Sequence, residues 1–120
     1  MNDLTEFAPA VHRFTVTEAD RPVFDGKVVH DVCSTYALAR EFEWAGRRVY
    51  LAHRPEGTEA IGTQVEVIHR ASAPVGAVLE VEAVPQSYQK GWLLVRATAH
   101  WQGKLIAEGT TTQKVLLPKV

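Results

Sequence analysis

The stretch TYALAREFEWAGRRVYLA, from Thr35 to Ala52, decides the fold, because it has the apolar spacing of a helix while the chain after it has that of strands. Its apolar residues recur at intervals of four, three, four and three, which is typical of a helix lying on a core. Ser34 or Thr35 supplies the N-cap, and Pro55 closes the far end. The predicted core stripe consists of Leu38, Phe42, Ala45, Val49 and Ala52.

Beyond Pro55 the hydrophobic period changes to two, which indicates strands. The first strand is predicted from about Ile61 to Ala71, with its odd-numbered residues facing the helix and its even-numbered residues facing away. The predicted inward residues are Ile61, Thr63, Val65, Val67, His69 and Ala71.

Three further strands follow, separated by short segments rich in Pro and Gly. They are expected over Val78 to Val84, Trp92 to Trp101 and Leu105 to Leu117. Because residues 74–76, 85–91 and 102–103 are short enough for hairpin-like connections, the pattern predicts a meander of four antiparallel strands. An earlier strand is expected at about Val11 to Thr17.

One helix and several long strands indicate an α+β protein. A curved antiparallel β-sheet wrapped around one long central α-helix buries the apolar stripe most economically, which predicts the hotdog architecture. With 120 residues, the chain is expected to form a single domain over residues 1–120. The outer sheet face and edge strand need cover, so we expect a homodimer.

Composition excludes several classes of protein. The chain is 46% hydrophobic and 22% charged, as in soluble globular proteins, and its formal net charge of -1 argues against nucleic-acid binding. No basic leader precedes an apolar segment, and no long apolar run is present, so we expect a cytoplasmic protein without a membrane segment. One cysteine, Cys33, excludes an intramolecular disulfide.

Glu43 is the first candidate for chemistry. A second helical stripe places it among small or aromatic neighbours, Ala39, Gly46 and Tyr50. An apolar flank favours the neutral form of a carboxylate, which makes Glu43 a candidate acid, base or nucleophile. The alternative is a half-exposed helix carboxylate paired with Arg40 or Arg47.

His69 and Thr35 are the other candidates. His69 is predicted on the inward face, either as a hydrogen-bonded core residue or as a proton-transfer group. Thr35 at the helix start is either an N-cap or a hydroxyl beside the free first-turn N–H groups. If Thr35 lies in the first regular turn, eight residues separate it from Glu43, about 12 Å of helix rise, and the two cannot touch. Either Thr35 lies on a loop that folds back, or the two residues contact different parts of one substrate.

The remaining motifs give weaker evidence for a functional site. Cys33 just before the helix is an activated thiolate or, more simply, a structural thiol. No histidine spacing typical of a metal site is present, and no nucleophile elbow, P-loop or dinucleotide fingerprint is found. The sequence therefore predicts neither a metal nor a cofactor.

From about Thr35 to Leu117 the chain resembles the fluoroacetyl-CoA thioesterase-like family of hotdog thioesterases. The most specific matches are Glu43-Trp44-Ala45 and the segment GTQVEVIHRASAP, residues 62–74. In that family a Thr before the helix, a Glu within it and a His near the end of the next strand form the catalytic set. The resemblance therefore implies catalytic roles for Thr35, Glu43 and His69, whose gaps of eight and twenty-six residues look like the family's.

One segment departs from the family pattern. The fluoroacetyl-specific member has a lid bearing a phenylalanine before the catalytic Thr, whereas residues 19–30 here look several residues shorter and contain Phe24 as their only Phe. The resemblance thus implies thioester chemistry without implying fluoroacetyl selectivity.

The leading hypothesis is a homodimeric thioesterase that hydrolyses a small or medium acyl-CoA to the free acid and CoA. Glu43 attacks the carbonyl or activates water, Thr35 positions the reactants, and His69 assists proton transfer. CoA is then part of the substrate. Two alternatives stay open: a hotdog hydratase, for which His30-Asp31 before the helix is suited, and a non-catalytic binder of acyl-CoA or another small acyl ligand.

Overall fold

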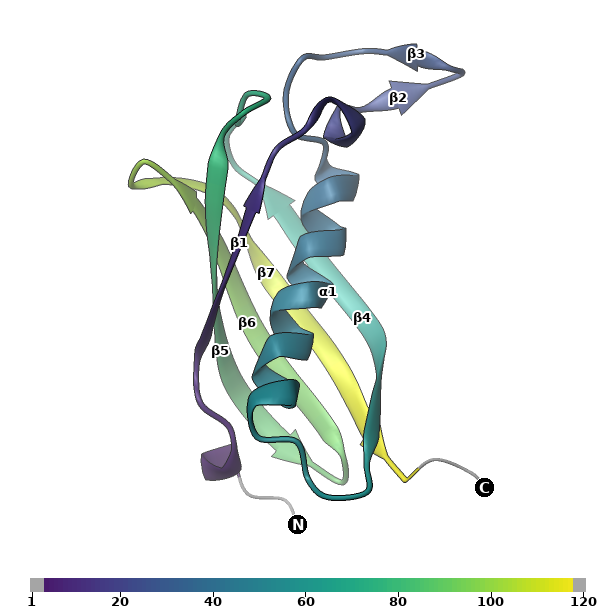
Figure 1. Ribbon diagram of the computed structural model, residues 1–120, viewed down its shortest axis with the longest axis vertical. Coiled ribbons are helices and arrows are strands. Elements are labelled where there is room, and N and C mark those ends of the chain that lie inside the picture. The colour runs from purple at the N-terminus through teal and green to yellow at the C-terminus, as the bar shows by residue number, and fades with distance from the viewer. Residues whose placement is uncertain (1–3, 118–120) are drawn as a thin grey trace.

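In the computed structural model, which describes residues 4–117, one long helix lies across a curled antiparallel sheet (Figure 1). The helix, α1, spans Thr35–Ala52. The sheet consists of β1 (Ala10–Thr15), β4 (Glu59–His69), β5 (Val78–Gln89), β6 (Trp92–Trp101) and β7 (Lys104–Leu116). The predicted hotdog architecture is confirmed, while the domain boundaries predicted at residues 1 and 120 lie outside the described residues.

Three small elements that were not predicted from the sequence precede the helix. Short 3-10 turns occupy Leu4–Glu6 and Glu18–Asp20. A two-stranded ribbon, β2 (Val23–Phe24) with β3 (Lys27–Val28), extends beyond the start of α1 in Figure 1. The first strand ends at Thr15 rather than at Thr17.

Strand order corrects the predicted four-stranded meander. The sheet order is β1-β5-β6-β7-β4, so β5, β6 and β7 form a meander, but β4 pairs with β7 at the far edge. The physical reason is the helix, which follows the edge strand β1 and lies across the inner face of the sheet (Figure 1). After α1 the chain enters β4 at the edge of the sheet opposite β1, where β4 pairs with β7.

The apolar stripe of α1 packs on the sheet as predicted, except at its end. Leu38, Phe42, Ala45 and Val49 are fully buried. Ala52 is exposed, because it is the last helical residue and the chain turns away there. Ser34 is the N-cap, and its hydroxyl oxygen accepts a 2.9 Å hydrogen bond from the Ala37 N–H.

A bulge in β4 overturns part of the predicted alternation. The pairing register with β7 shifts between Gly62 and Gln64, so the residues on either side of the bulge exchange faces. Ile61 is consequently 55% exposed, and Thr63 is exposed as well, although both were predicted to face the helix. Val65, Val67 and His69 lie beyond the bulge and are partly buried, as predicted.

A second bulge makes β5 longer than predicted. The strand continues through Pro85, with a register shift between Pro85 and Ser87, instead of ending at Val84. The connection predicted over residues 85–91 is therefore a short turn at Lys90 and Gly91, whose φ values are 50° and 82°.

Buried charged groups join β1 and the turn before the ribbon to α1. His12 donates from Nε2 to Glu41 at 2.7 Å, and its Nδ1 accepts from Arg48 at 2.7 Å. Arg40 bridges onward, donating to Glu41 at 2.6 Å and to Asp20 at 2.8 Å. Each buried charge thus has a partner of opposite sign, and the network fixes the position of the helix start.

Candidate active site

Thr35 and His69 meet at one end of the helix. Thr35 is the first residue of α1, and His69 is the last residue of β4. The Thr35 hydroxyl and Nδ1 of His69 share a hydrogen bond of 2.9 Å. Because Ser34 supplies the N-cap, the Thr35 hydroxyl is free for this contact.

The other imidazole nitrogen has no partner. Nε2 of His69 is buried and forms no hydrogen bond within residues 4–117. A buried polar atom without a partner is rare in a protein interior and is typical of a functional group awaiting a ligand. The Thr35–His69 pair therefore has a hydroxyl at the surface and an unused nitrogen behind it.

A cavity of about 650 Å³ opens beside this pair. Thr35, His69 and His30 provide its polar groups together with Arg21 and Ser34. The rest of the wall is largely apolar and consists of Ala19, Pro22, Val23, Phe24, Val32, Cys33 and Tyr36. An apolar cavity with few polar groups at one place suits an organic ligand that reacts at a single polar centre.

Unpaired N–H groups at the helix start border the cavity. The N–H of Ala37 donates to the Ser34 side chain and that of Leu38 to the Ser34 carbonyl. For the N–H groups of Thr35 and Tyr36 no partner is found within residues 4–117. Donors of this kind, at the positive end of the helix dipole, stabilise developing negative charge on an oxygen atom.

Glu43 lies apart from the pair. Thr35 is in the first regular turn, so the eight residues between them correspond to about 12 Å of helix rise, as the spacing predicted. Glu43 lines a different groove, of about 350 Å³, with Arg40, Trp44 and Arg47. One chain thus brings Thr35 and His69 together and leaves Glu43 further along the helix.

The predicted alternative for Glu43, a surface ion pair, is wrong. Arg40 binds Glu41 and Asp20 instead, and Arg47 binds Glu59 at 3.0 Å. Within the described part of the chain no hydrogen bond or ion pair of Glu43 is found, so its carboxylate has no polar partner there.

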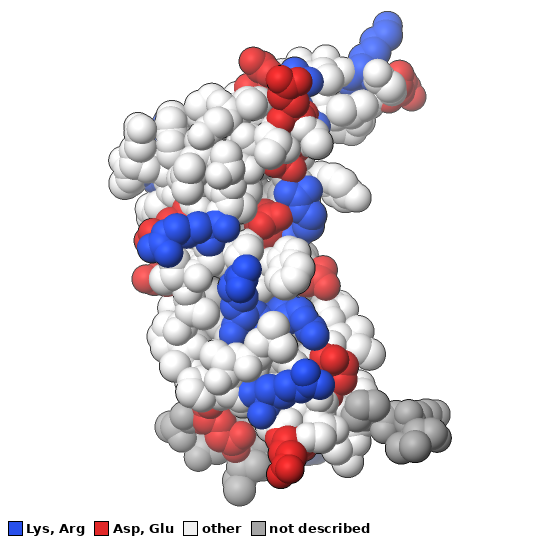
Figure 2. Space-filling model, in the orientation of Figure 1, with Lys and Arg blue, Asp and Glu red and all other residues white. Residues whose placement is uncertain are grey.

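Figure 2 shows basic side chains gathered over the face on which α1 lies. The helix contributes Arg40, Arg47 and Arg48 to this face. All three are already engaged, with carboxylates or with Nδ1 of His12. Carboxylates therefore neutralise Arg40 and Arg47, whereas the partner of Arg48 is an imidazole nitrogen and leaves its charge unbalanced.

The structure favours the interpretation of Cys33 as a structural thiol rather than an activated thiolate. Burial, and secondarily the negative charge of Asp20, raises the pKa of the Cys33 thiol to about 11. A thiol that stays protonated at neutral pH is a poor nucleophile, although Cys33 borders the cavity.

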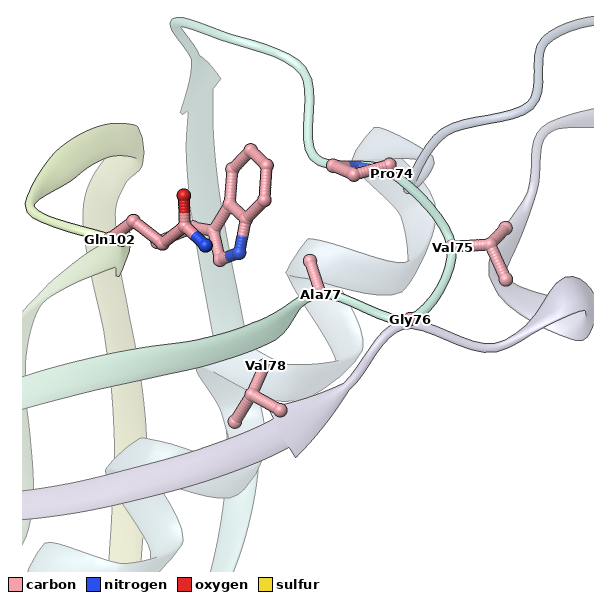
Figure 3. Close-up of a pocket in the computed structure, with 7 residues that line it drawn as sticks. Pro74, Val75, Gly76, Ala77, Val78 and Gln102 are labelled. Atoms are coloured by element: carbon pink, nitrogen blue, oxygen red, sulfur yellow. The ribbon is translucent and has the colours of Figure 1, made fainter.

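A second cavity, of about 520 Å³, lies beside the loop before β5 (Figure 3). Pro74, Val75 and Gly76 border it on one side and Gln102 on the other. None of the predicted site residues lines it. The loop instead holds the helix start, because the Cys33 N–H donates to the Ala73 carbonyl at 2.8 Å and Val32 forms a bridge with Pro74.

No group of three or more His, Cys, Asp or Glu side chains within residues 4–117 is arranged to hold a metal ion. No helix in this part of the chain is long and apolar enough to span a membrane.

Two residues near the predicted site, Tyr36 and Gly62, were not predicted from their sequence context. Tyr36 is 85% exposed and lines the cavity beside Thr35. A large aromatic residue off the apolar stripe of the helix was the available signal. Gly62 lies directly beneath Glu43, and its place inside a predicted strand was the signal for close approach.

One long helix across a curled antiparallel sheet is the architecture of the hotdog class of proteins. Comparison with known proteins agrees. A protein from Thermus thermophilus, described as a thioesterase superfamily member, is 34% identical and superimposes with a TM-score of 0.90 over 98% of this chain and 87% of its own.

The fluoroacetyl-CoA thioesterase FlK is 24% identical, with a TM-score of 0.82 over 92% of this chain and 87% of its own. A hot-dog-like protein from Thermanaerovibrio acidaminovorans is 17% identical, with a TM-score of 0.82 over 92% and 82%. These two likenesses show the fold. The curated proteins include none whose sequence matches this chain.

Residues 16–119 match the model of the family described as FlK, fluoroacetyl-CoA-specific thioesterase, and the chain belongs to that family. The protein is accordingly a thioester hydrolase.

Proposed function

We propose that the protein hydrolyses small or medium acyl-CoA thioesters, and that Thr35, Glu43 and His69 form its catalytic set. The observation that carries the proposal is the 2.9 Å hydrogen bond between Thr35 and His69 at the mouth of the apolar cavity. A thioester carbonyl placed there has the Thr35 and Tyr36 N–H groups within reach, and its acyl group has apolar walls.

The reaction needs a nucleophile, an oxyanion site and a proton donor. Water activated by the Glu43 carboxylate, or the carboxylate itself, attacks the thioester carbon, and the carbonyl electrons move to the oxygen beside the helix start. The carbon–sulfur bond then breaks, and the departing thiolate takes a proton that His69 relays. In the direct-attack variant, water cleaves the resulting anhydride and regenerates Glu43.

The separation along the helix supports a site shared between two protomers. Reacting groups must approach within about 3.5 Å, whereas Thr35 and Glu43 of one helix are about 12 Å apart in rise. A homodimer resolves the difference if one protomer contributes Thr35 and His69 and the other contributes Glu43. The free edge of β4, with Ile61 and Ile68 exposed on it, supplies apolar surface for such contact.

CoA enters as the leaving group, so no cofactor is required. FlK has been crystallised as a mutant with fluoroacetate and CoA, which supports CoA as the thiol half of the substrate. The cavity of about 650 Å³ beside the pair offers apolar walls to the acyl group of such a substrate.

A panel of acyl-CoAs of increasing chain length, incubated with the purified protein and a thiol reagent, tests the proposal. Release of free CoA thiol with a preference for small or medium chains supports it. Loss of enoyl absorbance without free thiol identifies a hydratase, consistent with His30 in the same cavity, and tight binding with neither identifies a binder. Either of these two outcomes overturns the proposed function.

A further inference from the structure

Gly62 in β4 lies where the Glu43 side chain comes down onto the sheet. A Cβ built on Gly62 would be 2.8 Å from Cδ of Glu43 and 3.1 Å from Cγ, and closer still to Oε2. Real Cβ atoms are not found at such distances from a carboxyl carbon. The carboxylate therefore occupies the space that any other residue at position 62 would fill.

Conformation does not explain this glycine. Gly62 is absent from the residues with positive φ, so its backbone is one that any L-residue adopts. Glycine in the interior of a strand weakens it and usually marks the close approach of another group. Here that group is Glu43, whose side chain has no hydrogen bond or ion pair within residues 4–117 to hold it in place.

The bulge beside Gly62 determines which face of β4 this residue lies on. The register shift between Gly62 and Gln64 lets Gly62 face α1, while Ile61 faces outward. Opposite Gly62 on β7 is Gln113, which is 1% exposed and whose amide Nε2 is buried without a partner in the described chain. The sheet position opposite Gly62 therefore holds a buried polar side chain rather than an apolar one.

We propose that Gly62 is a positioning residue for thioester hydrolysis, because its missing side chain leaves the space, here called the seat, in which the Glu43 carboxylate rests against β4. This inference rests on the proposed role of Glu43 and adds a residue that acts through it. A methyl group at position 62 lifts the carboxylate toward solvent. Little stability is lost, since Glu43 is exposed and its carboxylate has no hydrogen bond or ion pair in the described chain to lose.

The test is Gly62→Ala, with Gly46→Ala as a matched control. We expect Gly62→Ala to lower kcat about 100-fold with little change in KM or Tm, because displacement of a reacting group by about 1 Å has an effect of that size. Gly46→Ala adds the same methyl group three residues beyond Glu43 along α1, where an ideal Cβ meets Cγ2 of Thr111 on β7 at 2.5 Å. This control should lower Tm and leave kcat nearly unchanged in the folded protein.

Two further measurements separate the explanations. In the Glu43→Gln background, Gly62→Ala should cause no further loss, since both changes act on one group. A crystal structure of Gly62→Ala should show the Glu43 carboxylate displaced from β4. If Glu43→Gln is inactive while Gly62→Ala retains wild-type kcat, or if the carboxylate stays in place, the seat is refuted and the proposed function stands. If Glu43→Gln itself is active, the proposed role of Glu43 fails and the inference fails with it.

Discussion

The Thr35 hydroxyl, at the first residue of α1, lies 2.9 Å from Nδ1 of His69, at the last residue of β4. The two residues are 34 positions apart in the chain. They meet because α1 and β4 run alongside each other, so that the end of the strand returns to the start of the helix (Figure 1). Thr35 is free for this contact because its neighbour Ser34 caps the helix.

Thr35→Val tests the hydroxyl of this pair. Valine keeps the shape of threonine but cannot hydrogen-bond, so we expect kcat to fall about 10²- to 10⁴-fold, with Tm almost unchanged because Ser34 remains the cap. Thr35→Ser should keep much of the activity. His69→Ala should cause a loss of similar size, and the double variant little more, because the two groups act together. Additive losses in steady-state kinetics would contradict the pairing.

Glu43→Gln tests the carboxylate. Glutamine keeps the size and polarity of the side chain but is neither a nucleophile nor a base, so we expect turnover to be lost by at least about 10²-fold. Since Glu43 has no ion pair in the described chain, Tm should not fall. Single-turnover hydrolysis and thermal unfolding on the same preparation make the measurement. A Glu43→Gln enzyme with most of its kcat would place Glu43 outside the catalytic set.

Mixed dimers test whether the site is shared between protomers. Sedimentation should first show a species of about twice 13.3 kDa at micromolar concentration. Thr35→Val and Glu43→Gln protomers, each inactive alone, should regain roughly a quarter of wild-type activity when co-refolded. Half of the dimers are then mixed, and each mixed dimer has one intact site of two. Absence of any recovery in verified mixed dimers would mean that one protomer holds the complete site.

Acid should weaken the contact between the helix start and the preceding turn. Burial acts to raise the pKa of Asp20, but the Thr17 N–H, Arg40 and the Thr17 hydroxyl outweigh it and hold that pKa below its usual 3.8. A lowered folded-state pKa stabilises the fold above the unfolded value, and this contribution is lost as pH falls through the folded value. Wild type should therefore exceed Asp20→Asn in Tm at about pH 7, and the difference should shrink below about pH 4.

The control for this experiment is Glu80→Gln, which removes an exposed ion pair with Arg13. Such a pair contributes little, so Tm should change slightly at either pH. A difference between wild type and Asp20→Asn that is the same at pH 7 and pH 3 would contradict the linkage.

Cys33 should resist alkylation in the folded protein. Burial, with the Asp20 charge, raises the pKa of its thiol to about 11, so little thiolate is present at about pH 8. We expect iodoacetamide to modify Cys33 slowly in the native protein and rapidly after unfolding in guanidinium, as followed by mass spectrometry. Fast modification of the native protein at neutral pH would restore Cys33 as a candidate nucleophile.

Local pattern in the sequence determined the elements and the identity of the candidate residues. The spacing of Leu38, Phe42, Ala45 and Val49 predicts α1, and alternation predicts the strands, because side-chain periodicity depends on backbone geometry over a few residues. The resemblance to a known family identified Thr35, Glu43 and His69 as the candidate catalytic residues. The sequence spacing also predicted that Thr35 and Glu43 lie about 12 Å apart along the helix.

Tertiary structure decided what contacts what. The pairing of β4 with β7, the bulge at Gly62 that exposes Ile61, and the carboxylate of Glu43 resting on Gly62 are not visible in any local spacing. Each of these contacts depends on surfaces that come together only when α1 packs across the sheet. Nothing in the local sequence around Thr35 or His69 indicates that the two side chains contact each other. A single extra residue in a strand reverses which side chains face the core, so the alternation predicted for β4 holds only from Val65 onward.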